Sequence, residues 1–441
     1  MIVVPKFFLK LGYNLAFTLG FAVAWPLMAY LIWRRKPMWG KVGERFGHYP
    51  EKVKAWLRHP DRPVWIHAVS VGEVLLARVL IREMRKIKPN LRVFLTVGTP
   101  TGRRTAESLQ DERTCLTYVP TDFYHAMMRA FRRVHPRLLI LVENEIWPNM
   151  IWRAGKMGTP VCLVNSRLSR RNRGLLRFAQ PIVQPVFQLF DWVGVQSVQD
   201  LHRLGVAGFP EKRLHLMGSM KYDVADLVAD DPGKAQEILL RLGWTRGQVI
   251  LLAGSTHPGE EEILLRLFDG LRGKHPQLRL VLVPRHAERA GSILKIARAA
   301  GFSVILRSKL EHPFLPDPQI LVVDTTGELR DLYPAGDLVF IGKTLTGTGG
   351  QNFLEPARYG RAIFSGPHME NFQSLRDEFV QDRAMLICPD EESLRQEITR
   401  LLEAPEARQE LGRRARACFQ KHLGAGARHA EALVRLLGPE I

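Results

Sequence analysis

Two kinds of hydrophobic pattern alternate along most of this chain. Beyond residue 63, short apolar runs such as 64–69 and 137–142 alternate with stretches whose apolar residues recur every three or four positions. Runs of the first kind are typical of strands buried on both faces, and stretches of the second kind are typical of amphipathic helices. The alternation therefore predicts an α/β protein built on parallel sheets.

The apolar runs form two series with a polar segment between them. The expected strands of the first series are 64–69, 91–97, 137–142, 161–164 and 192–195, and those of the second are 249–253, 278–283, 303–306, 320–323, 338–341 and 362–364. Residues 221–234 between the series are rich in Asp and contain Asp-Pro-Gly, which is typical of a linker. We expect two Rossmann-like domains, 37–228 and 229–441, that face a cleft where ligands bind at the carboxyl ends of the strands.

The N-terminus follows neither pattern. Residues 11–33 form a stretch of roughly 23 positions without a charged side chain, which is long enough to span a bilayer core. Basic residues flank the stretch, most densely at 34–41, and favour a cytoplasmic location for the chain that follows. We expect residues 1–36 to be a membrane-anchor helix. Asn14, Gly20 and Pro26 favour the alternative, a helix that lies in the membrane interface without spanning it.

The charge of the whole chain indicates an anionic partner. The formal net charge is +19 over 441 residues, which suits an acidic membrane surface, a phosphorylated substrate or nucleic acid. Nucleic acid does not explain the anchor, and no basic motif interleaved with aromatic residues occurs. A membrane with anionic lipids is the expected partner, and the arginines at 167, 170, 171, 173 and 177 would meet lipid phosphates unless they form a solvated helix face.

A glycine-rich segment at residues 341–357 indicates a ligand site. It runs from an apolar strand through four glycines into the start of a helix, where backbone N–H groups can approach a phosphate closely. Asn352 and Glu355 add polar side chains to the turn, and Glu355 could hold the hydroxyls of a ribose. The alternative is a tight strand-to-helix connection without a ligand.

Three charged residues after strands of the first series could take part in chemistry. Glu73 could act as a general base, although Ser70 and Glu73 also have the spacing of a capping box. Glu143, followed by Glu145, could orient a catalytic group, or both could complement a helix dipole. Lys221 could balance charge on a leaving phosphate, or be an ordinary solvated lysine.

In the second series, further polar positions follow strands. Pro284 and Arg285 end one strand, and arginine is well suited to bidentate phosphate binding. The segment Gly327, Glu328 and Leu329 follows another strand and enters a helix. Together with the glycine-rich segment, these strand ends predict a nucleotide site. The chain contains no Walker loop, no His-Glu-x-x-His, no nucleophile elbow and no Asp-x-Asp, so we expect neither a metal nor a cofactor.

These motifs, in this order, resemble those of the 3-deoxy-D-manno-oct-2-ulosonic acid (Kdo) transferases of lipopolysaccharide synthesis. The motifs that carry the resemblance are His-Ala-Val-Ser-Val-Gly-Glu73, Glu143-Asn-Glu-Ile-Trp-Pro148, Gly218-Ser-Met-Lys-Tyr-Asp223, Pro284-Arg-His286 and Gly349-Gly-Gln-Asn-Phe-Leu-Glu-Pro356. The resemblance covers nearly the whole chain. It implies the GT-B architecture, in which two Rossmann-like domains bind the acceptor and the donor nucleotide, respectively.

The resemblance also implies substrates and roles. Such enzymes transfer Kdo from CMP-Kdo to a lipid A precursor at the cytoplasmic face of the inner membrane, without a metal. Glu73 would deprotonate the acceptor hydroxyl, and Glu143 and Lys221 would support the transition state. The residues that would hold CMP are Pro284, Arg285, Gly327, Glu328, Leu329, Asn352, Phe353, Leu354 and Glu355.

Together with the predicted anchor, the resemblance thus implies a membrane-anchored, inverting Kdo transferase acting on lipid IVA. The alternatives are another lipid A-directed GT-B transferase, a nucleotide-sugar epimerase of similar architecture, and a catalytically inert, membrane-bound module that binds a nucleotide sugar. The anchor disfavours the epimerase, and Glu73, Glu143 and Lys221 together disfavour the inert module.

Overall fold

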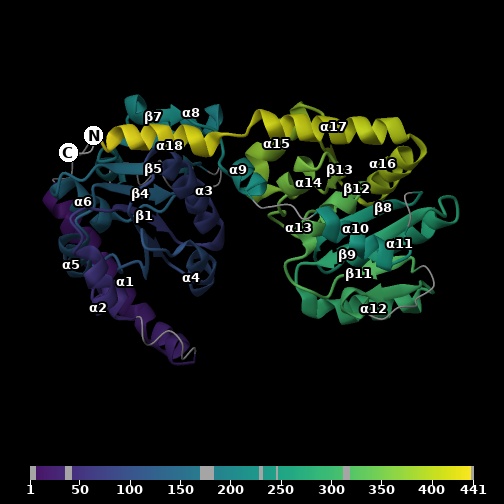
Figure 1. Ribbon diagram of the computed structural model, residues 1–441, viewed down its shortest axis with the longest axis horizontal. Helices are drawn as coiled ribbons and strands as arrows, with labels where there is room; N and C mark the ends of the chain where they lie inside the picture. The colour runs from purple at the N-terminus through teal and green to yellow at the C-terminus, as the bar shows by residue number, and fades with distance from the viewer. Residues whose placement is uncertain are drawn as a thin grey trace. The chain divides into compact units, whose positions relative to one another are not determined.

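The hydrophobic runs of the sequence form the strands of two parallel sheets. The structure is a computed structural model that describes residues 6–34, 42–168, 183–227, 232–244, 247–310 and 318–438. Within these residues each sheet has seven strands, and most strands are buried along their whole length (Figure 1). Apolar residues on both faces of a strand require a layer of helices on each side of the sheet. The predicted α/β fold with two Rossmann-like sheets is therefore confirmed.

The chain divides into two compact units. The first comprises Met1–Val224 and Gly424–Ile441, and the second comprises Ala225–Leu423. The boundary at Val224 falls within the segment that we expected to be a linker, four residues before the predicted boundary at 228. We also expected every residue after 229 to belong to the second domain, whereas the end of the chain returns to the first unit.

The first unit has strand order β3-β2-β1-β4-β5-β6-β7. Its strands are β1 (Val64–Ala68), β2 (Val93–Val97), β3 (Thr114–Tyr118), β4 (Leu138–Val142), β5 (Val161–Ser166), β6 (Trp192–Val195) and β7 (Leu214–Leu216). Its helices are α1 (Lys6–Arg34), α2 (Glu51–Leu57), α3 (Val71–Ile87), α4 (Pro100–Ala106), α5 (Tyr124–Val134), α6 (Pro148–Lys156), α8 (Val198–Ala207) and α18 (Ala425–Leu436). The helix α9 (Lys221–Asp226) carries the boundary. The chain reverses its direction of winding between β1 and β4, so the carboxyl ends of these two strands border the crevice typical of doubly wound sheets.

The second unit has strand order β10-β11-β9-β8-β12-β13-β14. Its strands are β8 (Val249–Thr256), β9 (Leu278–Pro284), β10 (Val304–Leu306), β11 (Ile320–Val322), β12 (Leu338–Ile341), β13 (Ala362–Ser365) and β14 (Leu386–Ile387). Its helices are α10 (Pro232–Arg241), α11 (Glu260–Arg272), α12 (Ala290–Ala299), α13 (Leu329–Leu332), α14 (Leu354–Arg358), α15 (Gln373–Gln381), α16 (Glu391–Glu403) and α17 (Pro405–Lys421). The winding reverses between β8 and β12, and the glycine-rich segment directly follows β12.

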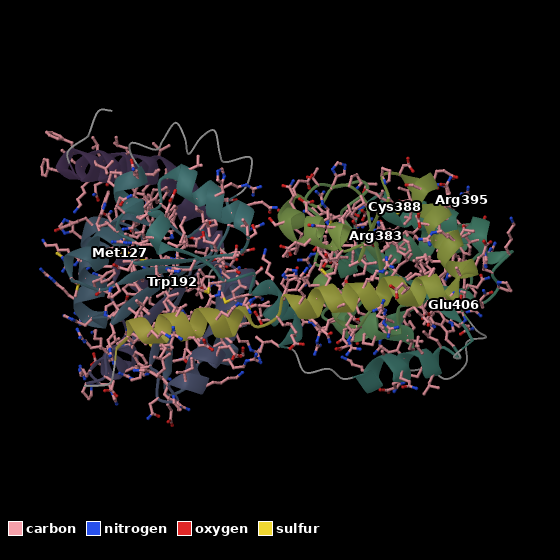
Figure 2. The ribbon with its side chains drawn as sticks, turned by 90° about the horizontal axis from the view of Figure 1, so that it is seen from above. Met127, Trp192, Arg383, Cys388, Arg395 and Glu406 are labelled. Carbon is pink, nitrogen blue, oxygen red and sulfur yellow. The ribbon has the colours of Figure 1, made fainter. Side chains whose placement is uncertain are left out.

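The last helix, α18, closes one face of the first sheet. It packs on α3 and is drawn in yellow over the first unit in Figure 1. Asp223 holds its start, because one carboxylate oxygen accepts from the N–H of Gly424 at 2.7 Å and the other from Gly426 at 2.9 Å. Further along, the ring of His429 lies edge-on to Trp192 with 5.6 Å between ring centroids, and Figure 2 shows Trp192 beside this helix.

The N-terminal helix α1 packs against the first unit through one face only. Its segment Phe7–Pro26 is long and apolar enough to cross a membrane, with a mean hydropathy of 1.4. Only 6% of an apolar stretch of 18 residues within it is buried. The buried side of the helix contacts α6 through Tyr13 and Trp152, and it contacts the loop before α5, where Phe17 and Phe21 both pack on Phe123. The opposite side leaves large apolar side chains exposed, including Leu11, Leu15, Leu19 and Val23.

Candidate functional site

In the first unit, the predicted site residues gather at the carboxyl ends of β1 and β4. Glu73 lies in the first turn of α3, two residues into the helix that follows β1, and Glu143 directly follows β4. Lys221 begins α9 and forms an ion pair with Glu143, with 3.7 Å between Nζ and Oε1. The sheet order places β1 beside β4. Glu73, Glu143 and Lys221 therefore all lie at the crevice edge of the first unit.

Glu73 is held as part of a helix cap. Its Oε2 accepts from the N–H of Val69 at 2.6 Å, and its Oε1 accepts from the hydroxyl of Ser70 at 2.8 Å. Ser70 Oγ in turn accepts from the N–H of Glu73. The capping interpretation of the Ser-x-x-Glu spacing is therefore correct, and the carboxylate also reaches the N–H of Val69. A cap fixes the position of a carboxylate, and this is also what a general base requires.

The electrostatics of this cluster suit acid–base chemistry. Burial raises the pKa of Glu73; the bonds from Val69 and Ser70 oppose the shift and the charge of Glu143 adds to it. Burial also raises the pKa of Glu145 to about 7, and the charge of Glu73 contributes. Burial lowers the pKa of the Lys221 ammonium, while Glu143 opposes the shift. Carboxylates whose pKa values are raised toward neutrality, next to a partly desolvated lysine, are typical of functional sites.

Asn165 connects the members of the cluster. It lies in β5 with φ of 55°, a left-handed conformation, and it is fully buried. Its Nδ2 lies 3.4 Å from Glu143 Oε1, and its Oδ1 accepts from the N–H of Met220, the residue before Lys221, at 2.9 Å. The backbone N–H of Asn165 donates to Nε2 of His429. One amide side chain thus positions both Glu143 and the start of the helix that carries Lys221.

His429 can accept this bond because it is neutral. Burial lowers the pKa of the imidazole to about 4. Its Nδ1 lies 2.8 Å from the carbonyl oxygen of Ala425 and serves as the donor, which leaves Nε2 as the acceptor. The returning helix α18 therefore contributes to the cluster through Asn165.

In the second unit, the predicted nucleotide-binding residues follow β9, β11 and β12. Pro284 ends β9, and the exposed Arg285 comes next, its N–H donating to the carbonyl of Thr256. Gly327 has φ of 91° and open space where a Cβ would lie. Glu328 forms an ion pair with Arg307 at 3.1 Å, and the partly buried Leu329 begins α13.

The turn around Asn352 combines polar side chains that pair with one another and two apolar side chains that are buried. Glu355 Oε1 accepts from Asn352 Nδ2 at 3.0 Å and pairs with Arg330 at 3.1 Å. The N–H of Leu354 donates to Asn352 Oδ1. The side chains of Phe353 and Leu354 are fully buried, so these two residues can offer a ligand only backbone groups.

A buried carboxylate holds the backbone at the start of the glycine-rich segment. The buried carboxylate of Glu260, at the start of α11, accepts from three consecutive N–H groups, those of Lys343, Thr344 and Leu345, at 2.7 to 3.1 Å. A protein carboxylate thus occupies the N–H groups at the start of the segment, before Gly347, Gly349 and Gly350. Gly342 is required here for close packing, because an added Cβ would lie 2.2 Å from the carbonyl oxygen of Ser255.

The comparisons with known proteins identify the family. Residues 40–224 match the profile of the family described as 3-Deoxy-D-manno-octulosonic-acid transferase (kdotransferase). The chain is 30% identical over 400 residues to the 3-deoxy-D-manno-octulosonic acid transferase of Haemophilus influenzae, covering 90% of this chain and 91% of that protein. This chain belongs to the Kdo transferase family. It is a glycosyltransferase, and the resemblance seen in its sequence motifs is confirmed.

Solved structures support the fold. A glycosyltransferase from Rickettsia africae is similar with a TM-score of 0.56 at 10% identity, covering 86% of this chain and 100% of that chain. The UDP-GlcNAc 2-epimerase from Neisseria meningitidis is similar with a TM-score of 0.58 at 12% identity, covering 85% and 99%. At such low identity the likeness concerns the fold alone, and it is the two-sheet fold of GT-B enzymes.

Three residues of the two sites in this Kdo transferase family member were not considered as site residues from the sequence. They are Asn165, Glu260 and Lys343. Lys343 has φ of 60° and lies against the glycines, its Nζ 3.7 Å from the Cβ position of Gly349. A lysine inside a glycine-rich segment is a visible signal for an anion site. Asn165 and Glu260 gave no such signal.

Two further sequence predictions concern metal ligands and the arginine-rich segment. Over the described ranges, no group of three or more His, Cys, Asp or Glu side chains could hold a metal ion. Of the arginines expected to meet lipid phosphates, Arg167 is described, whereas Arg170, Arg171, Arg173 and Arg177 lie outside the described residues.

Proposed function

We propose that this protein transfers Kdo from CMP-Kdo to a lipid A precursor, lipid IVA, and releases CMP. The observation that carries the proposal is the cluster of Glu73, Glu143 and Lys221 at the crevice edge of the first unit, in a chain that belongs to the Kdo transferase family. A base and a lysine at one crevice edge would serve the attack of a hydroxyl and the departure of a phosphate, respectively.

In the proposed reaction, Glu73 takes the proton of the acceptor hydroxyl. The hydroxyl oxygen then forms a bond to the anomeric carbon of Kdo, and the bond from that carbon to the phosphate oxygen of CMP breaks. The leaving phosphate keeps the electron pair, and the charge that develops there is balanced by Lys221. Attack on the face opposite the leaving group inverts the anomeric centre.

The second unit would hold the CMP of the donor. Arg285 is exposed directly after β9 and can reach a phosphate. Asn352 and Glu355 form a pre-arranged polar pair that could bind the ribose. Phe353 and Leu354 would contribute backbone groups only, and Gly327 with Glu328 and Leu329 would border the nucleotide.

The membrane would recruit the enzyme to its lipid acceptor. Helix α1 supports membrane attachment by its length and apolar exposed side, and we place the two units on the cytoplasmic face of the inner membrane. Polar contacts between the middle of α1 and the rest of the first unit favour a helix that lies in the membrane interface over one that spans the membrane once. The hydroxyl of Tyr13 donates to Asp122 at 2.8 Å, and Asn14 exchanges hydrogen bonds with Asn149, so the middle of the helix stays on the first unit.

The test is an assay with purified protein, CMP-Kdo and tetra-acylated lipid A precursor, without added metal. We expect CMP release and a product heavier by one or more Kdo units. Glu73→Gln is the sharpest variant, because glutamine keeps an oxygen that can accept from the N–H of Val69 but cannot take a proton. Glu73→Ala also loses the cap, which costs about 1 kcal/mol of unfolding free energy.

Both variants should bind CMP-Kdo without turning it over. Turnover by Glu73→Gln at the unmutated rate would exclude Glu73 as the base. No product from the unmutated protein, with CMP still bound, would favour another acceptor or an inert module that binds nucleotide sugars.

A further inference from the structure

A groove lies between α1 and the helices α5 and α6, within the first unit. Its volume is about 750 Å³, within the range of small-molecule sites. Residues of α1 form one wall, and residues of α5, α6 and the preceding loop form the other. None of Glu73, Glu143 and Lys221 lines the groove, so an occupant there is distinct from a group reacting at the carboxylate cluster.

The polar lining of the groove is cationic. Lys10, Arg153 and Lys156 line it together with His125, and no lining residue is acidic. The ammonium of Lys10 lies over the ring of Trp152, with 5.5 Å to its centroid. Within the described residues, the buried Nε of Arg153 has no hydrogen-bond partner. Three cations without an acid between them form a site for an anion.

The rest of the lining is apolar and continues onto the exposed side of α1. Phe7 and Leu11 belong both to the groove and to the exposed apolar side of the helix, with 69% and 55% of their surfaces accessible. Phe123 lies on the opposite wall. An occupant that is anionic at one end and apolar at the other matches this arrangement, and its apolar part would extend along the side of α1 that we propose to face the membrane.

We propose that this groove binds an anionic phospholipid of the membrane. Its phosphate lies among Lys10, Arg153 and Lys156, and one acyl chain begins along Phe7, Leu11 and Phe123. The volume fits a headgroup and the first part of a chain. The bound lipid thereby joins α1 to α6, the helix that follows the loop carrying Glu143 and Glu145. This inference rests on the membrane association proposed above, and its test separates the two.

The test is native mass spectrometry of the full chain in a mild detergent, titrated with dioleoyl-phosphatidylglycerol. We expect one retained lipid per chain. The variant Lys10→Gln/Arg153→Gln/Lys156→Gln should weaken binding roughly a hundredfold, since each of the three cations near an anionic headgroup contributes on the order of 1 kcal/mol, converted at 1.4 kcal/mol per tenfold. Because Arg153 is half-buried, Lys10→Gln/Lys156→Gln is measured as well and should show a smaller loss with unchanged folding.

The matched control removes the same charge elsewhere on the first unit. Arg62, Arg104 and Lys212 are exposed and do not line the groove. Their triple change to glutamine should leave the affinity within about twofold, as expected when screened charges lie outside the site. Equal losses in the two triple variants would mean that binding follows net charge, and no loss in the groove variant would overturn the site.

Three further probes define the chemistry. Dioleoyl-phosphatidylcholine has the same chains and no net charge, and inorganic phosphate has the charge and no chains; both should bind much more weakly than phosphatidylglycerol. Equal binding of phosphatidylcholine would overturn the anionic assignment. Displacement by tetra-acylated lipid A precursor would assign the groove to the acceptor instead. A sample that binds phosphatidylglycerol but transfers no Kdo would contradict the proposed function and leave this inference intact.

Discussion

At the scale of single residues, Glu143 acts on two neighbours of opposite charge. Its negative charge raises the pKa of Glu73 and opposes the lowering of the pKa of Lys221. Removing that charge by Glu143→Gln lowers both pKa values. In the proposed reaction Glu73 must be deprotonated and Lys221 protonated. Catalytic efficiency therefore rises with pH through the pKa of Glu73 and falls through that of Lys221.

We expect Glu143→Gln to move both limbs of the pH profile of kcat/KM toward lower pH. The acidic limb moves because Glu73 loses its proton more readily, and the alkaline limb moves because Lys221 loses its proton sooner. The measurement is kcat/KM for lipid acceptor across the pH range, with thermal unfolding as a control for folding. A variant that is merely slower, with both limbs unmoved, would show that Glu143 does not tune these two groups.

Asn165 offers a second prediction at this scale. Its side chain bonds Glu143 and the N–H before Lys221, while its backbone occupies the left-handed region. Asn165→Gly removes the side chain without backbone strain, whereas Asn165→Ala adds strain of about 1 kcal/mol. Both variants should lose kcat by roughly tenfold to a hundredfold, if the side chain contributes about 1 to 3 kcal/mol through two buried hydrogen bonds.

Binding of CMP to either variant should stay unchanged, as measured by calorimetry. Asn165→Ala should also unfold at a lower temperature than Asn165→Gly. Full activity in Asn165→Gly would show that Glu143 and Lys221 hold their positions without this amide.

The residues that the sequence could and could not predict differ in the reach of their contacts. Glu73 was predictable because its cap is local, between residues three and four positions apart. Asn165 contacts Glu143, Met220 and His429, which are 22, 55 and 264 positions away. Glu260 reaches the glycine-rich segment from more than 80 positions away. No local pattern records such contacts, and a helix start rich in Glu gives an equally good reason for Glu260 to be there.

At the scale of elements, the packing of α18 against β6 requires a residue without a side chain at one position of the strand. Gly194 in β6 leaves room for His429, because a Cβ there would lie 2.5 Å from Nε2 of that ring and 2.5 Å from the Trp192 ring. Gly194→Ala should therefore lower the free energy of unfolding of the first unit by about 1 to 3 kcal/mol through overpacking. Urea unfolding followed by tryptophan fluorescence measures the change.

Gly155→Ala is the matched control. Gly155 lies in α6, and its Cβ position has 3.8 Å to the nearest neighbour, Leu189. The same added methyl group should here raise the unfolding free energy by about 0.5 to 1 kcal/mol, because alanine favours a helix more than glycine does. Equal destabilisation by both changes would contradict the close packing of α18 on β6.

The elements that the sequence predicted are those buried on both faces. All eleven expected strands occur in the structure, because continuous apolar runs have few other places in an α/β fold. The missed strands are β3, β7 and β14. The first carries two threonines in five residues, and the other two span only three and two residues at the ends of their sheets. The return of α18 to the first unit was also missed, since its amphipathic pattern does not record which sheet it covers.

At the scale of the whole molecule, both the net charge and the apolar surface favour binding to a membrane. The salt dependence of binding distinguishes the two contributions. The chain has a net charge of +19, and attraction between exposed charges and anionic lipids weakens as salt is added. In the proposed membrane association, the exposed apolar side of α1 would contribute by burial, which salt does not weaken. The full chain should therefore remain on phosphatidylglycerol vesicles at high salt in a flotation assay.

Deleting α1 should change this behaviour without abolishing catalysis. A chain that begins after Arg34 keeps most of its basic residues, so we expect it to float with anionic vesicles at low salt and to leave them at high salt. The deletion uncovers Phe123 and removes the bond from Tyr13 to Asp122, whose pKa burial raises to about 7. The shortened chain should thus unfold more readily, yet transfer Kdo to detergent-dispersed acceptor, because none of the residues of the carboxylate cluster belongs to α1.

Tyr13→Phe is the control variant, because it keeps the apolar side of α1 and should stay bound to the vesicles at high salt. A folded deletion variant that is inactive on dispersed acceptor would show that α1 belongs to the catalytic machinery itself.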